Sequence, residues 1–337
     1  MTTITDIAKA AKVSTATVSR VLNFPETVSP ARRERVMRVI EELHYTPNAL
    51  ARELVTKSTK IIGLLLPDIT NTFSPTVINS FLQEMNKHGY NTLVCITNAD
   101  TEKECEYIKM MSKKRVEGFV FLGSRLHNSP NDSYIDQISV KTPVIMLDYL
   151  NKPHVSHVMV DEEKGAYLAT SYLLELGHRC IAFLNGPLSS SSYYHKHKGF
   201  LRAMREAGLE VSDKYQLTVA PNHLGGYEAT SELLQYHERP TAIFAAGDQI
   251  AVGAYRAAHE NGIEIPRDLS VIGFSGSPIS MSVYPPLSTV AQYAQEIGEQ
   301  AAYLMLELLE GKVKQKDIIL EPKILQRLSC APPNAAE

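Results

Sequence analysis

Short apolar runs alternate with longer amphipathic stretches from residue 61 to residue 273, and this alternation limits the possible folds more than any other feature. The runs expected to form strands cover residues 61–66, 92–97, 119–123, 144–148, 158–161, 180–186, 216–220, 242–247 and 271–273. Apolar residues recur at helical spacing over residues 76–89, 102–116, 164–176, 198–207, 225–235 and 250–261. This repeated strand–helix alternation predicts an α/β body with two doubly wound parallel sheets.

The first 46 residues have a different pattern, with signals for three short helices. Thr3 and Asp6 have the spacing of a capping box, in which each side chain bonds to the backbone of the other residue. Ser14 is the expected N-cap of a second helix. Ser29 is the expected N-cap of a third, with Pro30 in the first helical position, where its missing N–H costs nothing.

The first two of these helices are joined by a tight turn at Lys12-Val13, which matches the helix-turn-helix plan. The second helix has an apolar face of Val18, Val21 and Leu22. Its other face carries small, hydrogen-bonding and basic side chains, namely Thr15, Ala16, Thr17, Ser19 and Arg20. Small residues let a helix approach base edges closely, and a guanidinium can bridge phosphate or guanine acceptors. We therefore expect this helix to read the major groove of DNA.

Charge is unevenly distributed along the chain. Residues 1–60 contain ten Lys and Arg against six Asp and Glu, a net charge of +4, whereas the whole chain has a net charge of −3. A small basic head on an acidic body is typical of a module that binds a polyanion and is joined to a second domain.

Composition and missing motifs exclude several classes of protein. Hydrophobic residues make up 44% of the chain and charged residues 21%, and no apolar run reaches the roughly 18 residues of a membrane span. The first six residues lack a signal-peptide pattern. The cysteines (Cys95, Cys105, Cys180 and Cys330) have no metal-ligand spacing, which favours free thiols in a reducing cytoplasm. His195 and His197 point apart on a helix, so we expect no metal. No phosphate-binding glycine loop or catalytic set is present, and we expect no cofactor and no enzyme activity.

Four stretches of the head, in order, resemble the lactose-repressor/galactose-repressor (LacI/GalR) family of transcriptional regulators. They are Thr-Ile-Thr-Asp-Ile-Ala, Val-Ser-Thr-Ala-Thr-Val-Ser-Arg-Val-Leu-Asn, Val-Ser-Pro-Ala-Arg-Arg-Glu-Arg-Val and Tyr-Thr-Pro-Asn-Ala-Leu-Ala-Arg-Glu-Leu, all within residues 3–54. The resemblance implies a DNA-binding domain over residues 1–46 and a hinge helix and linker over residues 47–60. It implies DNA contacts by Thr5, Ser14, Thr15, Ala16, Thr17, Ser19, Arg20, Asn23, Asn48, Ala51 and Leu54. In this family a hinge leucine, here Leu54, wedges a base step open from the minor groove.

The same resemblance implies a body like that of periplasmic sugar-binding proteins, with an effector in a cleft between two lobes. The expected N-lobe covers residues 61–161 and 292–321, the C-lobe residues 162–291 and 322–330, and a tail residues 331–337. Ligands of open α/β sheets bind beyond the carboxyl ends of the strands. The residues expected there to contact the effector are Asp68, Phe73, Asp148, Ser192, Lys196, Asp248, Ser275 and Gln292.

Lys12 departs from the glycine often seen in the turn of this family, and three positions of the body depart from the family pattern as well. Lys196 stands where an effector-binding arginine is usual, Gly247 where an asparagine is usual, and Ser275 where an aspartate is commonly used for sugar hydroxyls. A lysine holds an anion as a point charge, and loss of an aspartate removes one repulsion. These changes favour a sugar phosphate or another anionic metabolite over a neutral sugar.

Together these features predict a bacterial, cytoplasmic, nucleoid-associated homodimer that binds a pseudo-palindromic operator. We expect a repressor of a carbohydrate-utilisation operon whose operator affinity depends on a sugar or sugar-phosphate effector. The tail has no leucine heptads, so no tetramer-forming helix is expected. The alternatives are a cytoplasmic small-molecule receptor, a regulator that responds to a purine or another metabolite, a sugar-transport receptor, and an enzyme that uses the cleft.

Overall fold

The computed structural model describes residues 2–45, 58–70, 73–123, 129–150 and 152–334. The chain forms two compact units, residues 1–60 and residues 61–337, which are called the head and the body below. The predicted hinge residues Asn48, Ala51 and Leu54 lie outside the described residues.

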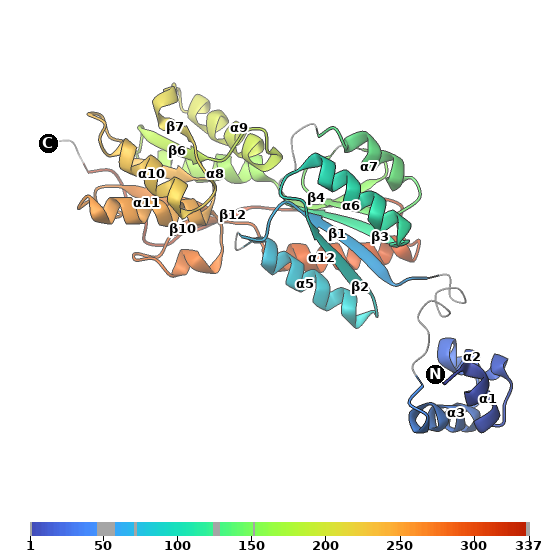
Figure 1. Ribbon diagram of the computed structural model, residues 1–337. Helices are drawn as coiled ribbons and strands as arrows, with labels where there is room; N and C mark the ends of the chain where they lie inside the picture. Colours follow the sequence, from blue (N-terminus) through green and yellow to red (C-terminus); the bar gives the residue numbers. More distant parts are fainter. Residues whose placement is uncertain (1, 46–57, 71–72, 124–128, 151, 335–337) are drawn as a thin grey trace. The chain divides into compact units, whose positions relative to one another are not determined.

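The head contains three α-helices in its described part, α1 (Ile4–Ala10), α2 (Thr15–Asn23) and α3 (Pro30–Glu42), with a short 3₁₀ turn at Pro25–Thr27 (Figure 1). Their shared core includes Ile7, Val18, Val21, Val36 and Val39. The three predicted helices are thus confirmed.

The predicted caps of α1 and α2 are confirmed, whereas α3 has the predicted cap residue without a capping hydrogen bond. The Thr3 backbone N–H donates to Asp6 Oδ2 over 2.8 Å, and the Asp6 backbone N–H donates to Thr3 Oγ1 over 3.3 Å. Ser14 Oγ accepts from the Thr17 N–H over 3.2 Å. Ser29 occupies the N-cap position of α3, but its side chain accepts no bond there, and Pro30 begins the helix.

Lys12, in the turn between α1 and α2, has a φ of 52°, a conformation that favours glycine. The turn therefore holds a residue with a side chain in the left-handed region, at the place where the two helices of the helix-turn-helix meet.

The body contains two six-stranded sheets, each covered by helices (Figure 1). The first sheet has the order β11-β5-β4-β3-β1-β2, and all its paired strands are parallel. Its strands are β1 (Ile61–Leu66), β2 (Asn91–Ile96), β3 (Gly118–Leu122), β4 (Val144–Leu147), β5 (Val155–Val160) and β11 (Asp317–Leu320). The helices that go with it are α5 (Phe73–Lys87), α6 (Thr101–Lys113), α7 (Asp132–Ser139) and α12 (Ala294–Leu309). This sheet and these helices are called the N-lobe.

The second sheet has the order β12-β10-β9-β8-β6-β7 and is parallel except for the pair β10–β12. Its strands are β6 (Ile181–Asn185), β7 (Gln216–Thr218), β8 (Ala242–Ala245), β9 (Ser270–Ser275), β10 (Ser288–Ala291) and β12 (Lys323–Leu325). The helices of this C-lobe are α8 (Glu162–Glu175), α9 (Ser191–Glu206), α10 (His223–Leu233) and α11 (Asp248–Glu260), with 3₁₀ turns at Asp213–Tyr215 and Pro278–Met281. The predicted α/β class with two doubly wound sheets is confirmed.

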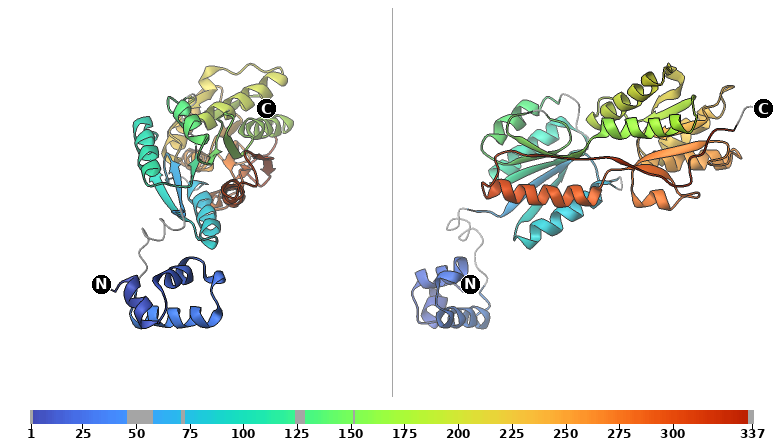
Figure 2. Two further views of the ribbon diagram at one scale, coloured as in Figure 1. Left: turned by 90° about the vertical axis from the view of Figure 1, so that its right-hand side faces the viewer. Right: turned by 180° about the vertical axis from the view of Figure 1, so that it is seen from behind.

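The chain passes between the lobes three times within residues 152–334. It crosses after β5, again between β10 and α12, and again between β11 and β12. Figure 2 shows α12 beside α5 in the N-lobe, although more than 200 residues separate the two helices in the sequence. Ile297, Ala301 and Met305 of α12 pack in the same apolar core as Phe81 of α5.

Several elements begin outside the predicted ranges or were not predicted. Helix α9 begins at Ser191, earlier than the predicted start at Lys198. The prediction missed the first turns because they are polar and aromatic and lack the apolar spacing of a surface helix. Strand β5 begins at Val155, three residues before the predicted start. Helix α7, helix α12 and strands β10, β11 and β12 carry no counterpart in the predicted set.

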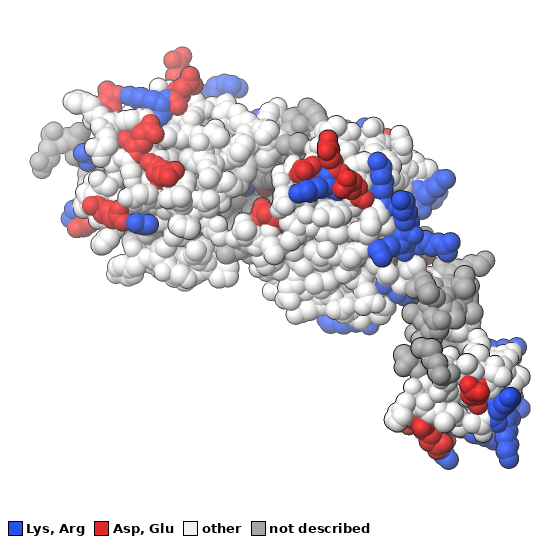
Figure 3. All heavy atoms as spheres, viewed as in Figure 1, with Lys and Arg blue, Asp and Glu red and all other residues white. Residues whose placement is uncertain are grey.

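On the face of the body drawn in Figure 3, Lys and Arg side chains gather over one end of the N-lobe, around α6. No helix of the described residues is long and apolar enough to cross a membrane.

Candidate functional site

In the head, α2 presents its predicted DNA-facing side chains away from the core. Val18 and Val21 are buried, whereas Thr15, Ala16 and Arg20 are exposed. Thr5 of α1 is exposed as well. The small residues therefore lie at the accessible N-terminal end of α2, where a helix backbone can approach base edges.

The remaining α2 residues of the predicted set are partly engaged within the helix. Ser14 Oγ and Thr17 Oγ1 lie 2.9 Å apart. Asn23 Nδ2 donates to the Ser19 carbonyl over 2.9 Å. The Ser14–Thr17 contact thus stabilises the start of α2, and the bond from Asn23 to Ser19 stabilises the end of the same helix.

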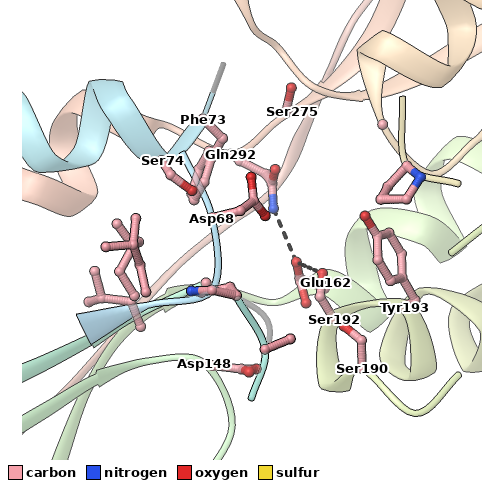
Figure 4. Close-up of a pocket in the computed structure, with 18 of the residues that line it drawn as sticks. Asp68, Phe73, Ser74, Asp148, Glu162, Ser190, Ser192, Tyr193, Ser275 and Gln292 are labelled. Carbon is pink, nitrogen blue, oxygen red and sulfur yellow. Dashed lines mark hydrogen bonds between the residues drawn. The ribbon is translucent and has the colours of Figure 1, made fainter. Parts of the chain in front are cut away.

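In the body, a cavity of about 400 Å³ is lined by residues of both lobes. It opens at the carboxyl ends of the parallel strands, where ligands of such sheets bind. All eight predicted effector contacts line it: Asp68, Phe73, Asp148, Ser192, Lys196, Asp248, Ser275 and Gln292. In Figure 4, Asp68, Phe73 and Ser74 lie on the N-lobe side of this space, and Tyr193 and Ser190 lie on the side of α9.

Glu162, the first residue of α8, is the centre of a hydrogen-bond cluster in the cleft that was not predicted from the sequence. Its Oε1 accepts from Ser192 Oγ over 2.5 Å and from Gln292 Nε2 over 3.1 Å (Figure 4). Lys196 Nζ lies 3.5 Å from the same oxygen. Glu162 directly follows the predicted crossing at Asp161, and that position was the only signal in the sequence that could have found it.

Lys196 is buried, with 5% of the residue exposed. Its Nζ donates to the Ala246 carbonyl over 3.3 Å and lies 4.3 Å from the centre of the Phe274 ring. Burial lowers the pKa of Lys196, and the negative charge of Glu162 opposes that shift. The expectation of an anionic effector assumed that this ammonium is available to a ligand. Glu162 already lies beside this ammonium as a counter-charge, so an anionic ligand would have to compete with it.

Asp248 lies at the start of α11, and both oxygens of its carboxylate accept hydrogen bonds from protein donors. Oδ2 accepts from Ser275 Oγ over 3.0 Å and from the backbone N–H and Oγ of Ser277 over 2.7 and 2.8 Å. Oδ1 accepts from Thr289 Oγ1 over 2.6 Å. Asp248 thus ties α11 to β10 and to the loop after β9. Ser275 has a φ of 132°, a strained value for a residue with a side chain, and such strain is concentrated at functional sites.

The N-lobe side of the cleft carries carboxylates of its own. Asp68 Oδ1 accepts from the backbone N–H and Oγ1 of Thr70, each over 2.8 Å. Asp148 is buried and accepts from the Tyr149 N–H over 2.7 Å. The Tyr149 ring stacks on the His195 ring of α9, with 3.7 Å between ring centres, so this pair joins the two lobes. Within the described part of the chain, no group of three or more His, Cys, Asp or Glu could hold a metal ion.

Comparisons with known proteins agree with this architecture. Residues 3–48 match the family model described as "Bacterial regulatory proteins, lacI family". Residues 59–326 match the model described as "Periplasmic binding proteins and sugar binding domain of LacI family".

Similar proteins match along almost their whole length. The chain is 37% identical to the HTH-type transcriptional regulator DegA of Bacillus subtilis, with 99% of both chains covered. It is 32% identical to the HTH-type transcriptional repressor PurR of Aliivibrio salmonicida, with 98% of this chain and 99% of the other covered. The lac repressor dimer bound to operator and an anti-inducer superposes with a TM-score of 0.90 at 26% identity, covering 98% of this chain and 99% of the other.

The helix-turn-helix head and the two-lobed body with its cleft define a DNA-binding transcriptional regulator with an effector-binding domain. The chain belongs to the LacI family of bacterial regulatory proteins. This is a family of regulators and not of enzymes.

Proposed function

We propose that this protein is a homodimeric repressor that binds a pseudo-palindromic operator through α2 and responds to a small molecule in the cleft. The observation that carries the proposal is the capped helix α2, with Thr15, Ala16 and Arg20 exposed on the side opposite its buried valines. The similarity to a lac repressor dimer bound to operator supports it. Two such helices, one from each protomer, would read two half-sites in successive major grooves.

The proposed operator complex also uses the segment between head and body. Asn48, Ala51 and Leu54 would contact the minor groove, with Leu54 as the wedge that kinks the DNA. Such a wedge costs a few kcal/mol of base unstacking, and the added contact offsets that cost. Thr5, Ser14, Thr17, Ser19 and Asn23 would position the head on the phosphate backbone, since backbone contacts fix register and base contacts specify sequence.

We propose a polyhydroxylated effector without a phosphate group, and a carbohydrate-utilisation operon as the target. Structures similar to this chain include a CelR–cellobiose complex, with a TM-score of 0.71, and an Enterococcus faecium regulator with bound ribose, with a TM-score of 0.72. Carboxylates such as Asp68 and Asp148 accept hydrogen bonds from hydroxyls, and the rings of Phe73 and Tyr193 can pack against apolar sugar faces. A purine-responsive regulator is the second candidate, favoured by the 32% identity to a PurR repressor.

The substitution Arg20→Ala tests the role of α2. DNA fragments selected in vitro by the full chain serve as operator, and binding is measured by fluorescence anisotropy over a series of salt concentrations. A base-contacting arginine contributes about 1–3 kcal/mol, so we expect operator affinity to fall by about tenfold or more, and preference over unrelated DNA to shrink.

Arg202→Ala is the matched control, because it removes the same charge from the body, where Arg202 pairs with Glu206. This variant should bind operator as the wild type does. Equal losses in the two variants, or unchanged binding by Arg20→Ala, would refute the assignment of α2 as the reading helix.

A further inference from the structure

The loops that enter the strands of the N-lobe sheet carry a group of exposed lysines. Lys113 is the last residue of α6 and Lys114 follows it before β3, Lys141 lies between α7 and β4, and Lys314 lies between α12 and β11. All four are exposed. These strands are parallel to β1, so the three connections lie at the same edge of the sheet as the start of β1.

This edge is where the chain arrives from the head. Lys60 directly precedes β1, and the Glu117 N–H donates to the Ile61 carbonyl over 2.8 Å, so the loop after α6 lies against the start of β1. Residues 46–60 can span no more than about 55 Å even when fully extended. DNA held by the head therefore stays within a limited distance of this edge.

Lys113 and the three connections (residues 114–117, 140–143 and 310–316) contain seven Lys and Arg against two acids, Glu117 and Glu310, and other acids nearby have partners of their own. Glu84 pairs with Lys87 over 2.5 Å, Glu307 with Lys316 over 3.1 Å, and Glu310 with Lys312 over 2.5 Å. Asp317 Oδ1 lies 2.8 Å from His157 Nδ1. Among the described residues, none of the four exposed lysines forms an ion pair. Figure 3 shows the basic side chains that gather around α6 at this end of the lobe.

The rest of the body has the opposite charge. The whole chain carries −3 and the head +4, which leaves a net charge of −7 on residues 61–337. Because the body as a whole is acidic, its overall composition does not account for a basic surface at this edge. The opposite edge of the same sheet, at the cleft, carries Asp68, Asp100 and Asp148 instead.

From this arrangement we propose that the strand-entry edge of the N-lobe, with Lys113, Lys114, Lys141 and Lys314, is a second DNA-contacting surface. It binds the phosphate backbone of the DNA that the head has engaged. The inference rests on the proposed DNA-binding function and adds a sequence-independent contact made by the body. Exposed lysines on flexible stems suit this role, because they attract phosphates as point charges without fixing a geometry.

The double variant Lys113→Gln/Lys114→Gln tests this proposal in the full chain. Operator binding is measured by anisotropy at several salt concentrations, and the slope of log affinity against log salt is compared with that of the wild type. Removing one lysine–phosphate interaction reduces the slope by about one, so the double variant should show a decrease of about two per protomer. Affinity for unrelated DNA should fall by a similar factor, because phosphate contacts carry no sequence information.

The matched control is Lys103→Gln/Lys214→Gln, which removes the same charge from two exposed positions away from this edge. Lys103 lies in the first turn of α6, at the cleft edge of the N-lobe sheet, and Lys214 lies in the C-lobe, where it pairs with Glu238. This control should leave the slope unchanged. An unaltered slope in Lys113→Gln/Lys114→Gln, with an unaltered melting temperature, would overturn the proposal and leave an acidic protein partner as the occupant of this surface. Failure of the wild type to bind any DNA would instead refute the proposed function itself.

Discussion

We expect a buried histidine in the C-lobe to make the stability of the protein depend on pH. His178 is 1% exposed. Its Nδ1 lies 2.8 Å from Thr241 Oγ1, and its Nε2 lies 2.9 Å from the Ala331 carbonyl oxygen. A carbonyl only accepts, so Nε2 carries a proton, and in the neutral ring Nδ1 accepts from the Thr241 hydroxyl, whose other acceptor, the Cys180 carbonyl oxygen, lies farther away at 3.3 Å. Burial lowers the pKa of His178 from 6.5 and keeps the ring neutral.

The depressed pKa has a definite consequence for unfolding. Unfolded His178 takes up a proton as the pH falls through about 6.5, whereas the folded ring, with its lowered pKa, does so at lower pH, so the free energy of unfolding falls with falling pH in this range. His178→Asn should give a flatter dependence between about pH 7.5 and 5.5, measured by urea denaturation. His237→Asn, outside the core, should keep the wild-type dependence. A wild-type profile in His178→Asn would show that this side chain is not responsible.

At the level of elements, two pairs of C-lobe helices pack so closely that glycine is required between them. A Cβ added at Gly226 of α10 would lie 2.0 Å from the Ile250 carbonyl oxygen of α11. A Cβ added at Gly253 of α11 would lie 2.0 Å from the His223 carbonyl oxygen of α10. A Cβ added at Gly199 of α9 would lie 2.0 Å from the Glu163 carbonyl oxygen of α8. These backbone atoms cannot move aside without separating the helices.

We therefore expect Gly226→Ala and Gly253→Ala each to lower the free energy of unfolding by about 2 kcal/mol or more, as overpacking does in cores. Gly247→Ala is the matched control, because the nearest atom to its added Cβ is Ile250 Cδ1 at 4.0 Å. Its effect should stay within about 1 kcal/mol. Guanidinium denaturation of the three variants provides the comparison, and equal stability of all three would contradict tight α10–α11 packing.

The sequence predicted the elements that have one apolar face. It failed where residues face the cleft and where the partners of a residue are distant in the sequence. The helices of the head and most strands follow from capping residues and apolar runs. The start of α9 does not, because Ser192, Tyr193 and Lys196 face the cleft and break the apolar pattern. Strand β12 has three residues and pairs with β10, so its partner is not evident from local sequence. Glu162 was missed for a related reason, since its partners Ser192 and Gln292 are distant in sequence.

At the scale of the whole molecule, the cleft couples ligand chemistry to the junction between lobes. Gln292 lies at the second crossing and donates to Glu162, which lies at the first. We expect a ligand that binds Glu162 to compete with this hydrogen bond and to change the restraint on the lobe angle. Ligands shift such an equilibrium only by their difference in affinity for the two states.

The Glu162–Lys196 pair predicts which ligand charge the cleft prefers. Because the charge of Lys196 is balanced by Glu162, glucose should stabilise the wild type at least as well as glucose 6-phosphate, measured as the rise in melting temperature. Glu162→Gln removes the carboxylate that lies beside the Lys196 ammonium, so a bound phosphate can take its place as counter-charge, and the order should reverse by about tenfold or more in affinity. Ser189→Ala, at another cleft-lining hydroxyl, is the control and should keep the wild-type order. A wild-type preference for the phosphate ester would contradict the neutral-effector proposal.

Because the chain returns to the N-lobe late in the sequence, the N-lobe is completed late during synthesis. Strand β11 pairs with β5, and α12 packs in the core with β1, yet both are made after the entire C-lobe sheet except β12. On the ribosome, the N-lobe remains incomplete until β11 has emerged, while the head can fold first, since domains fold as units during synthesis. A nascent chain could therefore hold a finished DNA-binding head well before it has a finished effector domain to control it.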